Sequence, residues 1–424
     1  MSYPQFFRVR QSFERPRVED IPGTVEAELS RLQLADRIRP GQTVAITAGS
    51  RGIINIRVIL RAAINHFKRL GARPFIVPSM GSHGGGTPAG QVEVLASYGV
   101  TEEYCGCPIK ASMETVVICQ TTEGFPVHFD RHAYEADHVL VCGRVKPHTD
   151  FTGDIQSGLM KMMLIGLGKH EGAKVYHRAI HDYSFPQIVR SVAGRVLKEC
   201  KIVAGLAVIE NGYDETAQIT AVRPEEIEER EKELLLVATR LMPRLPFREV
   251  DILVIDEIGK NISGTGMDTN VVGRKFNDHA AIENEWPKVR RIVVRSLTEQ
   301  THGNAAGIGM VEFCRTQALA QMDRQKTWVN ALTAGHISSV MIPLHYDSDR
   351  EILDNALPTI GLREPTDARV LWIKNTLELA EVECSAAYLQ EARSRSDLEI
   401  IAPVRPLGFD AAGNWPRFSQ EVGG

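Results

Sequence analysis

Short runs rich in β-branched residues alternate with longer amphipathic stretches along most of this 424-residue chain. Residues 43–47 have the pattern of a buried strand, and residues 54–70 that of an amphipathic helix. A second strand at 74–77 and a second helix at 89–98 repeat the order. Neighbouring strands joined through helices run parallel, so the sequence predicts an α/β fold with mostly parallel sheets.

The alternation continues with a strand at 138–142, a helix at 186–198 and a strand at 202–208. In an open parallel sheet, ligands bind at the carboxyl ends of the strands. The loops that leave these strands are therefore the places to look for functional residues.

A change of composition marks a domain boundary. Residues 224–240 form a highly charged predicted helix, and two prolines that follow closely end it and stiffen a linker. We predict an N-terminal α/β domain over 1–247 and a C-terminal α/β domain over 248–404, with 405–424 returning to the first. A small molecule would bind in an active-site cleft between the two domains.

Charge and composition exclude several classes of protein. The 49 Lys and Arg residues are balanced by 53 Asp and Glu, which gives a formal net charge of −4, so neither a nucleic acid nor an anionic membrane is an expected partner. The longest apolar runs hold about eight residues, whereas a membrane span needs ~20. Seven scattered cysteines and an N-terminus without an apolar signal segment favour a reduced, cytoplasmic protein.

The first candidate loop is Ala48-Gly49-Ser50-Arg51-Gly52, which follows the first strand. Small residues let a ligand approach the backbone, and Arg51 offers a two-pronged donor for a carboxylate or phosphate. The structural alternative is an ordinary turn with a solvated arginine.

The second loop, residues 78–88, places His83 among four glycines. Such a flexible sequence loses much conformational entropy on folding, which a simple connection does not require. A histidine, whose reference pKa is about 6.5, transfers protons at neutral pH and also binds metals. The alternative is a flexible surface loop.

The third stretch, residues 143–177, is the most informative. His148 follows a proline at a strand exit, and Lys161 lies inside an apolar run. A lysine surrounded by hydrocarbon either extends to solvent or has a chemical task. His170 and His177 are seven residues apart, and so lie on one face if the segment is helical. The alternative is a core segment with one exposed lysine and two surface histidines.

The fourth loop, residues 256–270, is rich in glycine and polar residues. Lys260 would reach an anion across the predicted cleft, with Asn261 beside it. The loop matches neither GxxxxGK[ST] nor GxGxxG, which disfavours a nucleoside triphosphate or an ordinary dinucleotide. A solvated surface loop is the alternative.

Three of these features together resemble the lactate racemase family, the 2-hydroxyacid racemases and epimerases that depend on a nickel-pincer nucleotide. They are Gly81-Ser82-His83, Pro147-His148, and Lys161 followed sixteen residues later by His177. The resemblance covers most of the chain and includes the two-domain layout.

The resemblance implies a role for each of these residues. Lys161 would hold the nickel-pincer nucleotide covalently through a thioamide, and His177 would bind nickel. His83 and His148 would be the acid–base pair on opposite faces of a 2-hydroxy acid. Ser50 and Arg51 would contact the cofactor, and Arg51, Lys260 and Asn261 the substrate. Enzymes that make the cofactor would be partners.

Two departures from the family's lactate enzymes point to another substrate. This chain has Ala48 where they carry an acidic residue, and Gly84 where they carry arginine. The stretch between His148 and Lys161 is also about three residues longer. A polyhydroxylated acid, an aldonate such as gluconate, would suit the additional polar side chains. These side chains are Asp150, Asp154, Gln156, Asn261 and Asp268.

Two other functions remain open from the residues. One is a zinc or iron hydrolase or dehydratase with His83, His148 and His177 as metal ligands, for which Lys161 would be dispensable. The other is a non-catalytic protein that binds a small anion or stores a cofactor. The sequence leaves the oligomeric state open.

Overall fold

The computed structural model describes residues 2–50, 52–180, 182–275 and 286–418. Contacts within the chain divide it into two units. The N-terminal unit is Glu14–Met242. The C-terminal unit combines Pro243 and the residues after it with the first thirteen residues of the chain.

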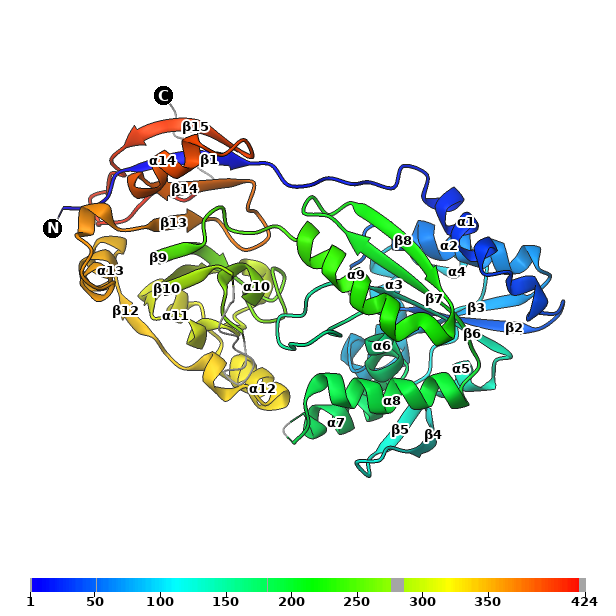
Figure 1. Ribbon diagram of the computed structural model, residues 1–424. Coiled ribbons are helices and arrows are strands. Elements are labelled where there is room, and N and C mark those ends of the chain that lie inside the picture. Colours follow the sequence, from blue (N-terminus) through cyan, green and yellow to red (C-terminus); the bar gives the residue numbers. More distant parts are fainter. Residues whose placement is uncertain (1, 51, 181, 276–285, 419–424) are drawn as a thin grey trace. The chain divides into compact units, whose positions relative to one another are not determined.

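A five-stranded sheet forms the centre of the N-terminal unit, in the order β3-β2-β6-β7-β8 (Figure 1). Its strands are β2 (Thr43–Ala48), β3 (Arg73–Pro78), β6 (His138–Arg144), β7 (Ile202–Glu210) and β8 (Thr216–Val222). The first four strands of that order are parallel, and β8 is antiparallel to β7. A separate hairpin of β4 (Thr115–Gln120) and β5 (Pro126–Asp130) was not foreseen from the sequence.

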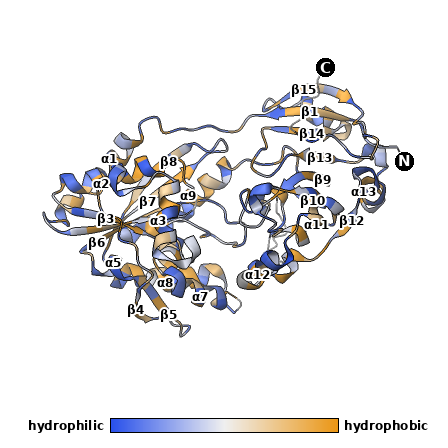
Figure 2. Cartoon of the chain, turned by 180° about the vertical axis from the view of Figure 1, so that it is seen from behind, coloured by the Kyte–Doolittle hydropathy of each residue, from blue (hydrophilic) through white to orange (hydrophobic). Residues whose placement is uncertain are grey.

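Helices cover both faces of this sheet. Val44 and Ile46 pack in one apolar cluster with α1 and α2, while Ala45 faces a second cluster with α8 and α9. This alternation follows from the two-residue period of a strand. The surrounding helices carry both hydrophilic and hydrophobic residues (Figure 2). The helices are α1 (Ile21–Arg31), α2 (Ile56–Arg69), α3 (Pro88–Ser97), α4 (Glu102–Cys105), α5 (Arg131–Glu135), α6 (Leu159–Lys161), α7 (Lys169–Ala179), α8 (Phe185–Glu199) and α9 (Ile227–Leu241).

The C-terminal unit contains an eight-stranded sheet in the order β12-β11-β10-β9-β13-β14-β1-β15. The strands from β12 to β13 are parallel, and the pairs formed by β14, β1 and β15 are antiparallel. The strands are β1 (Phe6–Gln11), β9 (Glu249–Ile258), β10 (Lys288–Leu297), β11 (Phe313–Arg315), β12 (Leu344–Tyr346), β13 (Val370–Ile373), β14 (Glu381–Ser385) and β15 (Leu398–Arg405). The helices are α10 (Thr269–Val272), α11 (Thr316–Ala320), α12 (Arg324–Ala334), α13 (Asp349–Ala356) and α14 (Leu389–Arg393). The predicted α/β class with mostly parallel sheets is therefore confirmed.

The two chain ends differ from the expectation. β1 lies between β14 and β15, so the start of the chain belongs to the C-terminal unit. The tail after β15 packs there as well, and does not return to the N-terminal domain. Trp415 stacks on Trp372, and the backbone N–H of Phe418 donates to Asp256. The tail packs on the C-terminal unit because its aromatic side chains are buried in the core of that unit.

The described helices include none with the length and apolar character needed to cross a bilayer. All seven cysteines are unpaired.

Candidate active site

Three loops leave the sheet of the N-terminal unit at one edge. β2, β3 and β6 are parallel neighbours, so their carboxyl ends lie together. The segment from Leu159 to Ala179 packs against two of these loops. A Cβ on Gly49 would lie 3.1 Å from Met162 Cε, and one on Gly81 would lie 3.1 Å from Ile165 Cγ2. The segments that contain Ser50, His83 and Lys161 are thus brought to one place, as parallel topology requires.

His83 lies in the glycine loop and is exposed. Its Nδ1 atom is hydrogen-bonded to the hydroxyl of Ser50, and Tyr98 Oη donates to the carbonyl of Ser50 at 2.6 Å. Gly84 has a φ of +65°, and a Cβ there would lie only 2.5 Å from the carbonyl carbon of Gly90. The loop therefore requires glycine at this position. Arg51, the next predicted residue, lies outside the described residues.

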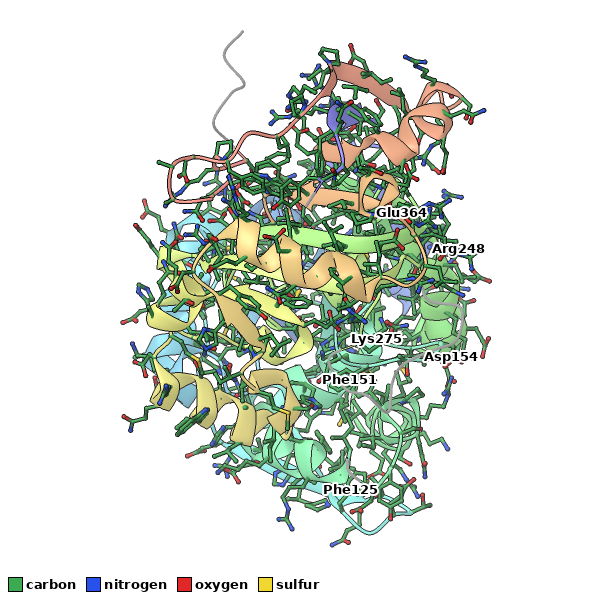
Figure 3. All side chains as sticks on the ribbon, turned by 90° about the vertical axis from the view of Figure 1, so that its left-hand side faces the viewer. Phe125, Phe151, Asp154, Arg248, Lys275 and Glu364 are labelled. Atoms are coloured by element: carbon green, nitrogen blue, oxygen red, sulfur yellow. The ribbon has the colours of Figure 1, made fainter. Side chains whose placement is uncertain are left out.

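Lys161 and His148 are in direct contact. The Nζ atom of Lys161 lies 2.6 Å from Nε2 of His148. Phe151 stacks on the His148 ring at 4.2 Å and on Phe185 at 3.8 Å, which fixes the plane of the imidazole. Figure 3 labels Phe151 and Asp154 of the loop between β6 and α6. Lys161 is followed at once by a π-helical turn, Met162–Gly166, a rare conformation that is frequent at functional sites.

Hydrogen bonds define the tautomer of His148. Nδ1 accepts the backbone N–H groups of Asp150 at 3.0 Å and Phe151 at 3.2 Å. The ring proton of a neutral His148 is therefore on Nε2 and points to Lys161. The Nζ atom of Lys161 lies beside this nitrogen and over the ring of Phe151, 4.9 Å from its centroid.

The helix α7 carries both His170 and His177, as their spacing suggested. His170 Nδ1 is buried and has no hydrogen-bond partner among the described residues. It faces the glycine loop, where a Cβ on Gly86 would lie 3.8 Å away. His177 lies exposed on the same helix. The contacts described above join His83 to Ser50 and His148 to Lys161, and they do not extend to His177.

A fully buried lysine was missed by the sequence analysis. Lys169, the first residue of α7, is 0% exposed and pairs with the equally buried Asp130 at 3.1 Å. Its ammonium group also donates to the carbonyl of Pro78 at 2.5 Å and to Gln91 at 3.3 Å. Gln91 in turn donates to the carbonyl of His83 at 3.3 Å. Burial lowers the pKa of Lys169, and Asp130 opposes this shift. One buried cation thus ties the His83 loop to α7.

A buried glutamate was also missed. Glu231 of α9 accepts the backbone N–H groups of Leu159 at 2.5 Å and Met160 at 3.1 Å, at the start of the helix that carries Lys161. The glutamates around it are typical of a solvent-exposed helix face, so Glu231 does not stand out in the sequence. The available signal was position: Glu231 comes four residues after Ile227 and three before Leu234, on the apolar stripe of α9.

Lys260 and Asn261 lie in the C-terminal unit, in the loop after β9. Lys260 Nζ donates to the carbonyl of Gly264 at 2.5 Å, and Asn261 Oδ1 accepts from the Thr298 hydroxyl at 2.5 Å. Their role toward a substrate stays a prediction.

Three of the polar residues considered for a polyhydroxylated substrate have structural partners. Asp154 pairs with Arg190 at 2.6 Å. Gln156 accepts the backbone N–H of His148 at 2.9 Å. Asp268 accepts the backbone N–H of Asn270 at 2.9 Å and caps α10.

Within the described part of the chain, no three His, Cys, Asp or Glu side chains are arranged to hold a metal ion. His148 is directed to Lys161 and His83 to Ser50.

Comparisons with known proteins agree with the fold. Residues 15–185 match the family model of the lactate racemase N-terminal domain, a range that contains His83, His148, Lys161 and His177. The lactate racemase apoprotein from Thermoanaerobacterium thermosaccharolyticum is similar in structure, with a TM-score of 0.51 and 14% identity over 83% of this chain and 91% of that one. A Thermotoga maritima protein gives a TM-score of 0.48 and 12% identity over 77% and 84%. No curated protein matches the sequence significantly.

Proposed function

We propose that this chain, a member of the lactate racemase family by its N-terminal domain, is an isomerase that inverts C2 of a 2-hydroxy acid. The observation that carries the proposal is the contact between Lys161 Nζ and His148 Nε2 at 2.6 Å. It lies at the loop-bearing edge of the parallel sheet, and within the range matched by the family's domain. A lysine amine held in one place next to a histidine is, once deprotonated, a nucleophile suited to covalent attachment of a cofactor.

The residues present fit a nickel-pincer nucleotide. Lys161 would hold the nucleotide through a thioamide, and His177 would supply a single imidazole to nickel, whose other ligands would be the soft donors of the cofactor itself. His170 Nδ1, buried without a partner among the described residues beside the glycine loop, leaves a polar atom for a bound group to satisfy. When bound, this cofactor supplies the hydride acceptor that no side chain provides.

His83 and His148 would manage the proton of the substrate hydroxyl on the two faces of C2, since inversion needs a proton donor or acceptor on each face. His83 would use Nε2 toward the substrate, since its Nδ1 atom is hydrogen-bonded to Ser50. At His148, Nε2 now faces Lys161. His148 would give or take a proton at this nitrogen toward a substrate oxygen.

We propose an aldonate such as gluconate as the substrate. Ala48 and Gly84 stand where the family's lactate enzymes carry an acidic residue and an arginine, and the additional polar side chains of this chain would suit a polyhydroxylated acid. Ser50 and Arg51 would contact the cofactor, and Arg51, Lys260 and Asn261 the substrate. We also propose a cytoplasmic location, which the seven unpaired cysteines support. The partners would be the enzymes that make the cofactor.

The test is the denatured intact mass of the chain co-expressed with the biosynthetic genes of the nickel-pincer nucleotide, beside Lys161→Ala. We expect an adduct of nucleotide size on the wild type and none on the variant, together with epimerisation of an aldonate by the wild type. An unmodified mass in both proteins would contradict the proposal and return the chain to the hydrolase or anion-binding alternatives.

A further inference from the structure

Glu231 places a carboxyl group in the apolar interior of the N-terminal unit. The residue is 1% exposed, on a stripe of α9 that otherwise presents Ile227, Leu234 and Leu235 to the core. Its Oε2 atom accepts two backbone N–H groups, and Oε1 is buried without a partner among the described residues. Burying a carboxyl group costs free energy because the group loses its hydration, whereas an apolar residue at this position would have no such cost. The presence of the acid therefore calls for an explanation.

The reason lies at the start of the helix that carries Lys161. The first N–H groups of a helix have no partner inside the helix. At α6, the N–H groups of Leu159 and Met160 donate hydrogen bonds to Glu231, which lies more than seventy residues later in the chain. The side chain therefore acts as a helix cap supplied by another element.

The backbone around this cap is fitted closely. Gly158 has a φ of +87°, and a Cβ there would lie 2.7 Å from Oε2 of Glu231. A Cβ on Gly205 of β7 would lie 2.4 Å from Leu159 Cδ1, and one on Gly143 of β6 would lie 3.3 Å from the Gly158 carbonyl oxygen. The first turn of α6 is thus held between two strands and α9, with no room for displacement toward any of them.

This cap sets where the Lys161 side chain begins. Lys161 is two residues after Leu159, about half a helical turn. His148 belongs to a loop that is held separately, because its N–H donates to Gln156 and Ser157 is bonded to Lys146. The contact between Lys161 and His148 therefore depends on two supports, the loop bonds on one side and Glu231 on the other.

We propose that Glu231 is a positioning residue for Lys161, because its carboxyl group fixes the first turn of α6 so that the lysine nitrogen stays at Nε2 of His148. The importance of this position rests on the proposed function, but the positioning itself is measurable on the chain without any cofactor. Burial raises the pKa of the Glu231 carboxyl to about 8, against the effect of the two N–H groups, which accords with its place in the core.

The experiment compares the reactivity of Lys161 in four proteins: the wild type, Glu231→Leu, Glu231→Asp and Glu233→Gln. Glu231→Leu removes the acceptor and fills the apolar stripe. Glu231→Asp keeps the acid but withdraws it by one methylene from Leu159. Glu233→Gln is the matched control, since Glu233 is on the exposed side of the same helix and is paired with Arg230. The probe is the N-hydroxysuccinimide ester of acetic acid at pH 7, read by peptide mass spectrometry.

Lys326, an exposed lysine of α12 in the C-terminal unit, is the internal reference. We expect acetylation of Lys161 relative to Lys326 to fall about tenfold in both Glu231 variants, since an amine displaced from His148 loses its contact with the imidazole and takes on the reactivity of an ordinary exposed lysine. Glu233→Gln should match the wild type. A purely structural role would lower the melting temperature and leave this ratio unchanged.

An unchanged ratio in the Glu231 variants that fold would overturn the proposal. If Glu231→Leu does not fold, Glu231→Asp, which keeps the buried acid, carries the test. The outcome is separate from that of the proposed function. A tenfold fall without any nucleotide adduct in co-expressed protein would support the positioning and contradict the function, whereas an adduct with an unchanged ratio would do the reverse.

Discussion

The amine of Lys161 lies 2.6 Å from Nε2 of His148, while Nδ1 of the same ring accepts two backbone N–H groups from its own loop. The loop thereby orients the ring of the histidine, and the ring nitrogen that faces Lys161 lies at hydrogen-bond distance from its amine. In the sequence, His148 is a histidine at a strand exit and Lys161 a lysine in an apolar run, with nothing to connect them. In the folded chain the two side chains form a pair.

Replacing either proposed proton-transfer histidine should nearly abolish turnover. In protein that carries the cofactor, His83→Ala and His148→Ala are each expected to slow epimerisation by at least ~100-fold, the usual contribution of a positioned acid or base. Nickel content, measured by mass spectrometry of the metal, should stay at the wild-type level. His177→Ala should show the converse, with the nucleotide adduct kept and nickel lost. Loss of nickel in His83→Ala or His148→Ala would reassign that residue to the metal.

The glycine loop should tolerate a side chain at one position and not at the next. Gly84→Ala and Gly85→Ala both introduce a Cβ at positive φ, +65° and +66°. At Gly84 the new atom lies 2.5 Å from the Gly90 carbonyl carbon, whereas at Gly85 nothing lies within 4 Å. We expect Gly85→Ala to cost about 1 kcal/mol of stability with turnover retained, and Gly84→Ala to lose turnover because the His83 loop must move. Equal turnover in the two variants would refute this account of the loop.

Removing the buried Lys169 should destabilise the N-terminal unit. Lys169→Met leaves Asp130 buried without its cation, which we expect to cost about 3–5 kcal/mol in urea unfolding. The double variant Lys169→Met/Asp130→Asn should recover much of this loss, since no charge is then left unpaired. Lys174→Met, on the exposed side of the same helix, should change stability by less than about 1 kcal/mol. If Lys169→Met were as stable as the wild type, the ion pair of Lys169 with Asp130 would not stabilise the N-terminal unit.

The free energy of unfolding should depend on pH through Glu231. Its pKa is about 8 in the folded chain, against the ordinary value of 4.5. Between these values the folded state holds a proton that the unfolded state has released, so this group's contribution to stability is lost as the pH rises toward 8. The slope is at most about 1.4 kcal/mol per pH unit. Urea unfolding of the wild type and Glu231→Gln at pH 5.5 and 7.5 measures this slope, and the variant should lose this part of the pH dependence. If the free energy of unfolding changed equally with pH in both proteins, Glu231 would not be the group responsible.

The C-terminal tail should stabilise only the C-terminal unit. Trp415 is 5% exposed and packs on Phe6 and Trp372, so Trp415→Ala is expected to cost about 3–5 kcal/mol. Amide hydrogen exchange should speed up in β9 and β13 and stay unchanged in β2 and β6. Leu362→Ala, at a fully exposed position, serves as the control and should have little effect. Faster exchange in β2 and β6 instead would place the tail on the N-terminal unit.

Local pattern was enough to find the frame of the N-terminal unit. The strands at 43–47, 74–77, 138–142 and 202–208 were all recognisable, and each lies within the observed strand. Buried parallel strands are continuous apolar runs and the connecting helices have a 3.6-residue period, both properties of a few consecutive residues. The parallel order then implied that the Ser50 and His83 loops leave the same edge as the His148 loop, which the structure shows.

The supports of the site could not be found in this way, because each depends on a partner distant in the chain. Glu231 belongs to a run of glutamates, and only the packing of α9 on α6 makes it the one that caps the Lys161 helix. Lys169 looks like any charged residue until Asp130 and Pro78 surround it. The sequence of the tail does not show in which of the two units its aromatic side chains are buried. A periodic pattern reports which face of an element is buried, whereas the compensation of a buried charge is a pairwise property of the folded chain.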